Sequence, residues 1–157
     1  MSLARNDLPE TAAFASIFEE YGPRIWRAVR HLGVVEADVE DVCQEVFLAV
    51  HRGLGRFREE SSVWTWIYGI CVRQVGLYRR RPYRRRESPL GDELPEGTVP
   101  ALQERDAETN QLLEKLYAAL DQIDDDKRTV YVLYELEGGT MAEVAQIVGC
   151  PDRKSVV

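Results

Sequence analysis

The side chains with the clearest chemistry lie between Trp64 and Arg86, where aromatic rings are interspersed with arginines. Residues 73–86 hold seven Arg and no acidic residue, although the whole chain has a net charge of −7. Uncompensated guanidinium groups repel one another, so a polyanion is the favoured partner; a solvated helix end is the alternative. Arginine neutralises phosphate, and aromatic rings stack on unpaired bases for about 1–3 kcal/mol per base. The segment therefore predicts a site for single-stranded or melting DNA.

A second candidate surface is the polar side of the segment from Ala37 to Arg52. Its apolar residues recur at helical spacing and predict one buried stripe: Val39, Val42, Cys43, Val46, Phe47 and Val50. The remaining faces carry Asp38, Glu40, Asp41, Gln44 and Glu45. Acidic residues in the first turns also suit the helix dipole. Periodicity thus leaves two interpretations open, a protein-binding face and a merely solvated one.

The sequence offers no grouping expected of an enzyme. It has no pair of carboxylates with a shared site, no nucleophile beside a base and no phosphate-binding loop, and His31 and His51 are isolated. Cys43, Cys71 and Cys150 are too far apart for metal-ligand spacing, and the first two fall on apolar helix faces. We therefore expect no catalysis, no metal and no cofactor, with Cys43 and Cys71 buried as small apolar side chains.

The pattern of elements predicts an all-α protein of two small helical domains, residues 1–86 and 107–157. Residues 87–106, with three Pro and two Gly, are predicted to form a flexible acidic linker. In the first domain, Gly22-Pro23 indicates either one kinked helix or two helices, and Ser61-Ser62 offers an N-cap. No apolar run approaches the roughly 20 residues of a membrane span. We expect a cytoplasmic protein without membrane insertion, since the N-terminus also lacks a secretory signal.

The sequence pattern does not decide, for every position of the third predicted helix, whether the side chain is buried or exposed. This helix is predicted to begin after Ser62. Its inward residues by spacing are Val63, Trp66, Ile67, Ile70 and Cys71. Trp66 is expected in the core, whereas Trp64 and Tyr68 have equal claims to exposure and burial. In the second domain, Thr140 to Glu143 is a capping-box pattern that opens a short helix before a turn at Gly149. This is the start of a helix-turn-helix.

Three stretches resemble the extracytoplasmic-function (ECF) sigma factors of the sigma-70 family. They are DVEDVCQEVFLAV, FREESSVWTWIYGICVRQVGLYRRR and ALDQIDDDKRTVYVLYELEGGTMAEVAQIVGCP. The specific signal is the D-x-E-D-x-x-Q-E-x-F spacing followed by W-T-W-I-Y, and the resemblance covers residues 14–151. It implies a region 2-like helix bundle in residues 1–86 and an incomplete region 4-like helix-turn-helix in residues 107–157.

The resemblance also implies a function without catalysis, namely directing RNA polymerase to promoters. The residues that would bind core RNA polymerase are Asp38, Asp41, Gln44 and Glu45. The residues that would bind the −10 element of promoter DNA are Trp64, Thr65, Tyr68, Arg73, Gln74, Tyr78, Arg79, Arg80 and Arg81. The family often has Asn near Arg73 and Asp near Leu77, so the −10 preference is expected to be unusual. An anti-sigma factor is a further implied partner.

The second helix of the helix-turn-helix is expected to begin near Asp152, and only six residues run from there to Val157. We expect the natural protein to continue beyond this point, and the present chain to recognise the −35 element poorly. An alternative function is a regulator or competitor that binds polymerase without initiating transcription. A helix-bundle enzyme is a weaker third interpretation.

Overall fold

The computed structural model describes residues 10–81 and 106–149, and all regular elements within these ranges are helical. The N-terminal unit consists of α1 (Glu10–His31), α2 (Glu36–Gly53), the short 3₁₀ turn η2 (Leu54–Arg56) and α3 (Val63–Arg79). The C-terminal helices are α4 (Ala107–Asp121), α5 (Asp125–Tyr131), the π-helical turn η5 (Val132–Leu136) and α6 (Met141–Ile147). The predicted all-α class is confirmed.

The helices begin and end where local chemistry predicts. The Ser62 side chain accepts a hydrogen bond from the Thr65 backbone N–H at 3.1 Å, which caps α3. Gly33, with φ of 106°, follows α1 in a conformation that glycine adopts without a steric penalty. Thr140 and Glu143 form the expected capping box at the start of α6. Pro23 lies inside a single continuous α1, on its exposed side, so the two-helix alternative is wrong.

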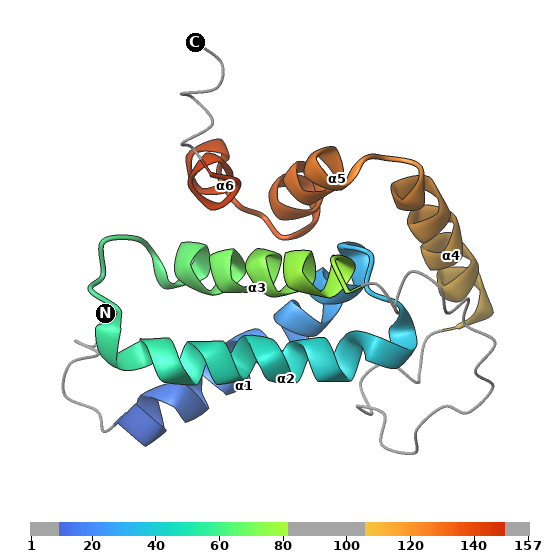
Figure 1. Ribbon diagram of the computed structural model, residues 1–157. Helices are drawn as coiled ribbons and strands as arrows, with labels where there is room; N and C mark the ends of the chain where they lie inside the picture. The colour runs from blue at the N-terminus through green and yellow to red at the C-terminus, as the bar shows by residue number, and fades with distance from the viewer. Residues whose placement is uncertain (1–9, 82–105, 150–157) are drawn as a thin grey trace, which may run out of the picture.

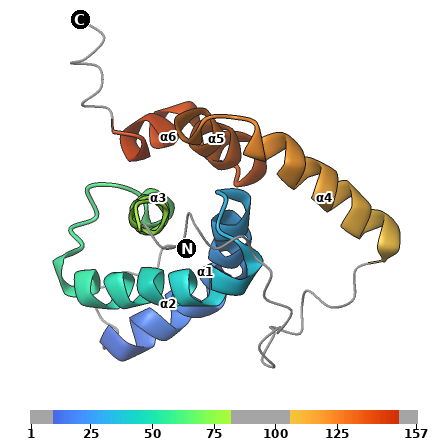
Figure 2. The same cartoon turned by 45° about the vertical axis from the view of Figure 1, so that its right-hand side comes forward.

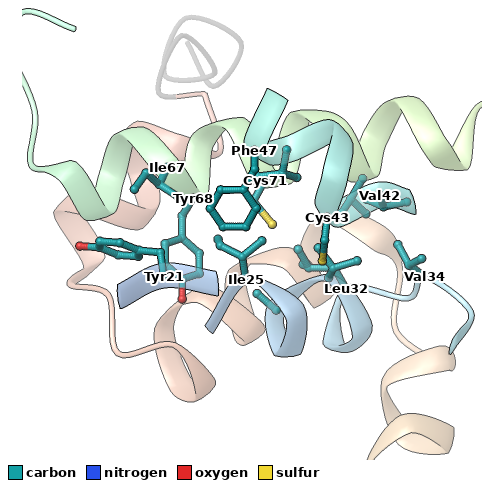
Figure 3. Packing of buried hydrophobic residues seen from close by; sticks show 14 of the residues in the cluster. Tyr21, Ile25, Leu32, Val34, Val42, Cys43, Phe47, Ile67, Tyr68 and Cys71 are labelled. Atoms are coloured by element: carbon teal, nitrogen blue, oxygen red, sulfur yellow. The ribbon is translucent and has the colours of Figure 1, made fainter. Parts of the chain in front are cut away.

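The C-terminal helices lie across α3 on the side away from α2 (Figures 1 and 2). One continuous apolar core joins the two parts, because the buried cluster of α1, α2 and α3 extends into the C-terminal helices. Figure 3 shows labelled members of that cluster, among them Ile25 of α1, Phe47 of α2 and Cys71 of α3. The C-terminal helices add Val132, Leu133 and Val144. The proposed domain boundaries stay a prediction, since residues 82–105, most of the predicted linker, lie outside the described residues.

The buried face of α3 is wider than the sequence pattern predicts. Ile67 and Cys71 are buried as expected, but Trp66 is only half-buried and stacks on Phe57. Val63 and Ile70 are also half-buried. The full buried set on α3 is Thr65, Ile67, Tyr68, Cys71, Val75 and Tyr78. The reason is that α3 packs against α2 on one side and α6 on the other, so a single apolar stripe does not describe it.

Within the part of the chain that the structure describes, no helix is both long and apolar enough to cross a membrane. The same residues contain no group of three or more His, Cys, Asp and Glu side chains that could hold a metal ion. The helix expected near Asp152 lies outside the described residues.

The shared core makes a stability prediction for Leu133, which is fully buried. Leu133→Ala should lower the free energy of unfolding by about 2–5 kcal/mol, because it removes apolar packing and leaves a cavity. Chemical denaturation followed by circular dichroism measures this. Leu112→Ala is the matched control, since Leu112 is 66% exposed and should change stability by no more than about 0.5 kcal/mol. Equal effects of the two variants would contradict the shared core.

Candidate functional site

The outer face of α2 presents two of the four residues predicted to bind polymerase. Asp41 and Gln44 are exposed, whereas Asp38 and Glu45 are half-buried. Gln44 lines a cleft of about 1040 Å³ between α1 and α2. Polar residues Glu19, Arg27, Glu40 and His51 also line it. The cleft thus places an amide and charged groups beside apolar surface.

The apolar lining of this α1–α2 cleft comes mostly from aromatic rings of α1 and α2. Its members are Phe14, Phe18, Trp26, Phe47 and Leu48. Phe18 is 52% exposed and Leu48 is 54% exposed. The Phe18 ring nevertheless packs edge-on against Phe47, with 4.9 Å between the ring centroids. Exposed apolar surface of this kind marks interaction sites. The sequence pattern does not single out Phe14 and Phe18 for this role, because helical spacing does not distinguish a core face from a docking face.

Cys43 also lines the α1–α2 cleft, but it is not a reactive group. Burial, with the nearby Glu40 carboxylate, raises the pKa of the Cys43 thiol to about 12. Burial likewise raises the pKa of Cys71 well above its ordinary value. Both cysteines are buried and free, which confirms the expectation that they act as small apolar side chains.

Two predicted DNA-binding residues pair with two predicted polymerase-binding residues. The Tyr78 hydroxyl donates to the Asp38 carboxylate at 2.7 Å. The Arg81 guanidinium donates to both Glu45 carboxylate oxygens, at 2.8 and 3.1 Å. These contacts bind the C-terminal end of α3 to α2. Both members of each pair are therefore engaged inside the N-terminal unit.

Arg79 is held at the C-terminal end of α1. Its guanidinium donates to the Leu32 carbonyl and lies 3.7 Å from an Asp125 carboxylate oxygen of α5. Burial lowers the pKa of Arg79, with Asp125 opposing the shift. Carbonyls at a helix C-terminus carry partial negative charge, so a cation is favourable there. The family resemblance predicts only a DNA contact for Arg79.

The aromatic end of α3 is covered rather than open. Trp64 is half-buried and stacks on Tyr68 with ring centroids 4.4 Å apart, while Thr65 and Tyr68 are buried. The Tyr68 hydroxyl donates to the Glu137 carboxylate at 2.6 Å. Burial and this carboxylate raise the pKa of Tyr68, so the phenol stays neutral and acts as a donor.

The nine residues predicted to bind DNA therefore do not form one exposed surface. Arg73 and Arg80 are exposed, and Gln74 is half-buried. Arg73 lies on an exposed side of α3, and Arg80 directly follows its last residue. Both side chains are accessible to solvent and can contact phosphate groups without a change in the structure.

Residues 17–86 match the sequence model of Sigma-70 region 2. The match spans most of α1, all of α2 and all of α3. Over these residues the chain matches the sigma-70 family, as the paired motifs predict.

Its curated relatives are ECF members of that family. It is 30% identical over 122 residues to the ECF RNA polymerase sigma-E factor of Haemophilus influenzae, covering 73% of this chain and 65% of the relative. The sigma-E factor of Escherichia coli K12 is 30% identical over 128 residues, covering 75% of this chain and 66% of the relative. The chain thus spans a little under two thirds of these relatives' length.

Two solved structures share the fold. CnrH, in complex with the cytosolic domain of CnrY, aligns with a TM-score of 0.65 at 23% identity, covering 93% of this chain and 78% of that one. The sigma factor RpoE, in complex with the anti-sigma factor NepR from Bartonella quintana, gives a TM-score of 0.65 at 17% identity, covering 85% of this chain and 81% of that one. These likenesses extend over both the N-terminal unit and the C-terminal helices.

The hydrogen bond between Tyr78 and Asp38 predicts that substitution of Tyr78, a residue expected to bind DNA, lowers the stability of the protein. Tyr78→Phe should lower the free energy of unfolding by about 1–3 kcal/mol, because a hydrogen bond to a carboxylate is removed. Urea denaturation measures this. Tyr134→Phe, at a 44% exposed tyrosine, is the control and should have an effect below about 0.5 kcal/mol. If both variants were equally stable, Tyr78 would have no structural role.

Proposed function

We propose that this chain is an ECF-type sigma factor that binds core RNA polymerase through α2 and the α1–α2 cleft, and directs promoter-specific initiation of transcription. One observation carries the proposal. The match to Sigma-70 region 2 falls on a three-helix unit whose α2 exposes Asp41 and Gln44, and Gln44 lines an open apolar cleft.

The α1–α2 cleft suits an amphipathic helix of the polymerase. Such a helix would place its apolar side on Phe18 and Leu48 and its polar side near Asp41 and Gln44. Asp38 and Glu45 stabilise this surface indirectly, because their hydrogen bonds to Tyr78 and Arg81 hold α2 against α3. They are positioning residues in this proposal.

For the −10 element we propose a division of labour. Arg73 and Arg80 contact phosphates directly, since both are exposed. Trp64, Thr65 and Tyr68 supply stacking and hydrogen-bonding groups for unpaired bases, and Gln74 lies next to Arg73 on α3. Tyr78, Arg79 and Arg81 mainly fix the end of α3.

Readout of the −35 element is assigned in this proposal to a helix that begins near Asp152 and enters the major groove.

A second candidate function is a polymerase-binding competitor that does not initiate. The observation that favours it is the burial of Thr65 and Tyr68 beneath the C-terminal helices while the α1–α2 cleft stays open. We also propose an anti-sigma protein as a partner, because RpoE, a protein of the same fold, was crystallised with one.

The first test is affinity of the full chain for core RNA polymerase. Asp41→Arg should weaken binding about tenfold or more, because a like charge at a complementary interface costs several kcal/mol. Gln44→Ala should weaken it less. Biolayer interferometry with immobilised polymerase measures both. Glu114→Arg is the control, since it makes the same charge change at an exposed site on α4.

Undiminished binding by Asp41→Arg would overturn the proposed polymerase surface. Transcription from a promoter library with the reconstituted polymerase then separates the two candidate functions. An initiator yields promoter-specific transcripts, whereas a competitor only suppresses those made by another sigma factor.

The second test concerns the salt dependence of binding to single-stranded DNA. Replacing Arg73 and Arg80 with Ala should make the slope of log K against log salt shallower by about 0.7 for each phosphate that is no longer neutralised. Fluorescence anisotropy over a salt series measures the slope. Arg52→Ala with Arg56→Ala is the control, because these arginines are also exposed but lie at the other end of the unit. An unchanged slope for the Arg73 and Arg80 pair would mean that these two arginines belong to a solvated helix face.

A further inference from the structure

Arg24 of α1 holds its guanidinium over two tyrosine rings. The guanidinium carbon lies 5.0 Å from the ring centroid of Tyr21, on the same helix, and 6.0 Å from the ring centroid of Tyr68 on α3. Both tyrosines are buried and are labelled in Figure 3. Arg24 itself is half-buried, so part of its surface stays in contact with water. Its charge therefore lies where α1 meets the aromatic end of α3.

Arg24 differs from the other arginines that are buried or half-buried in the described part of the chain. Each of the others donates a hydrogen bond to an acceptor in the protein: Arg30 to the Val34 carbonyl, Arg79 to the Leu32 carbonyl, Arg81 to Glu45 and Arg128 to the His31 carbonyl. Within residues 10–81 and 106–149, Arg24 makes contacts with the two rings but no hydrogen bond and no ion pair. Its five N–H donors are thus available to a ligand.

The carboxylate that approaches Tyr68 does not neutralise Arg24. The Glu137 carboxylate accepts the Tyr68 hydroxyl at 2.6 Å and lies 3.7 Å from Nδ1 of His31. Burial raises the pKa of Tyr68, and the positive charge of Arg24 opposes that shift. The electric field of Arg24 thus reaches the phenol, although no ion pair forms between Arg24 and Glu137.

A guanidinium held over aromatic rings is suited to binding phosphate. The rings attract the cation through their negative faces, and the planar guanidinium keeps donors that match phosphate oxygens. A side chain that is already held in place loses less conformational entropy when a ligand binds. Trp64 stacks on Tyr68 with ring centroids 4.4 Å apart, so Arg24 lies beside a pair of rings of the kind that stack on unpaired bases.

The first part of α3 supplies no cation of its own. The helix has no basic residue between Val63 and Val72, and its first arginine is Arg73. At about 1.5 Å per residue, Arg73 lies about 14 Å along the helix from Trp64. A DNA strand at the aromatic end therefore needs a phosphate contact from another element, and α1 offers one in Arg24.

We propose that Arg24 is a further DNA-binding residue, which binds a backbone phosphate of single-stranded DNA beside the aromatic end of α3. This inference rests on the proposed function and adds a contact from α1 to a site otherwise built from α3. Arg24 is not among the residues that line the α1–α2 cleft. Its role is thus confined to DNA and does not extend to polymerase.

Arg24→Gln tests the inference, because it removes the charge and keeps a side chain of similar length. Binding of the full chain to a fluorescein-labelled oligothymidine should weaken about fivefold at about 0.1 M salt, and the slope of log K against log salt should become shallower by about 0.7. Arg24→Lys should restore the slope, since an ammonium group also neutralises one phosphate. Fluorescence anisotropy over a salt series measures both quantities.

Arg30→Gln is the matched control. Arg30 is also half-buried on α1, and its guanidinium carbon lies 4.0 Å from the ring centroid of Tyr117. The control therefore makes the same charge change over another tyrosine, near the C-terminal end of α1, and should leave the slope unchanged. The salt slope counts neutralised phosphates, so a purely structural role of Arg24 would not alter it. Affinity of Arg24→Gln for core polymerase should equal that of the unsubstituted chain.

The outcomes separate the inference from the function on which it rests. If Arg24→Gln keeps the full salt slope, or if Arg30→Gln reduces the slope equally, the phosphate contact of Arg24 is overturned, while the proposed roles of Arg73 and Arg80 stand. If the unsubstituted chain binds no oligothymidine, either alone or with core polymerase, the proposed DNA-binding role of α3 is overturned together with this inference.

Discussion

The position of α3 between two layers is the constraint on which the rest of the structure depends. Its Tyr68 ring has no exposed surface, and burying a phenol is favourable only if its hydroxyl finds a partner. Glu137 supplies that partner from 69 residues further along the chain. The C-terminal helices therefore complete a core that α1 and α2 leave open on one side of α3.

The two candidate surfaces differ in their exposure to solvent. The α1–α2 cleft is open and apolar with a polar edge, which is the usual character of a surface for a partner helix. The aromatic end of α3 is covered by the protein itself.

The contacts of Tyr78 with Asp38 and of Arg81 with Glu45 connect these surfaces. Each contact joins a side chain assigned to polymerase with one assigned to DNA. A ligand that binds Glu45 must also provide a hydrogen-bond acceptor for Arg81. Otherwise the charge-assisted hydrogen bond between Arg81 and Glu45 is lost without replacement. Residues of this kind hold the geometry of both surfaces, so their substitution affects stability together with binding.

The sequence by itself determined the features that arise within a few residues of one another. Ser62, Gly33 and Thr140 mark helix ends because caps and left-handed turns are local interactions. The buried stripe of α2 follows from helical periodicity, and the paired motifs predicted the sigma-70 family. Only the tertiary structure decided that Tyr68 is buried and that Arg128 caps α1, because their partners lie 69 and 97 residues away. Spacing along a helix gives which residues share a face, but not how many neighbouring elements cover it.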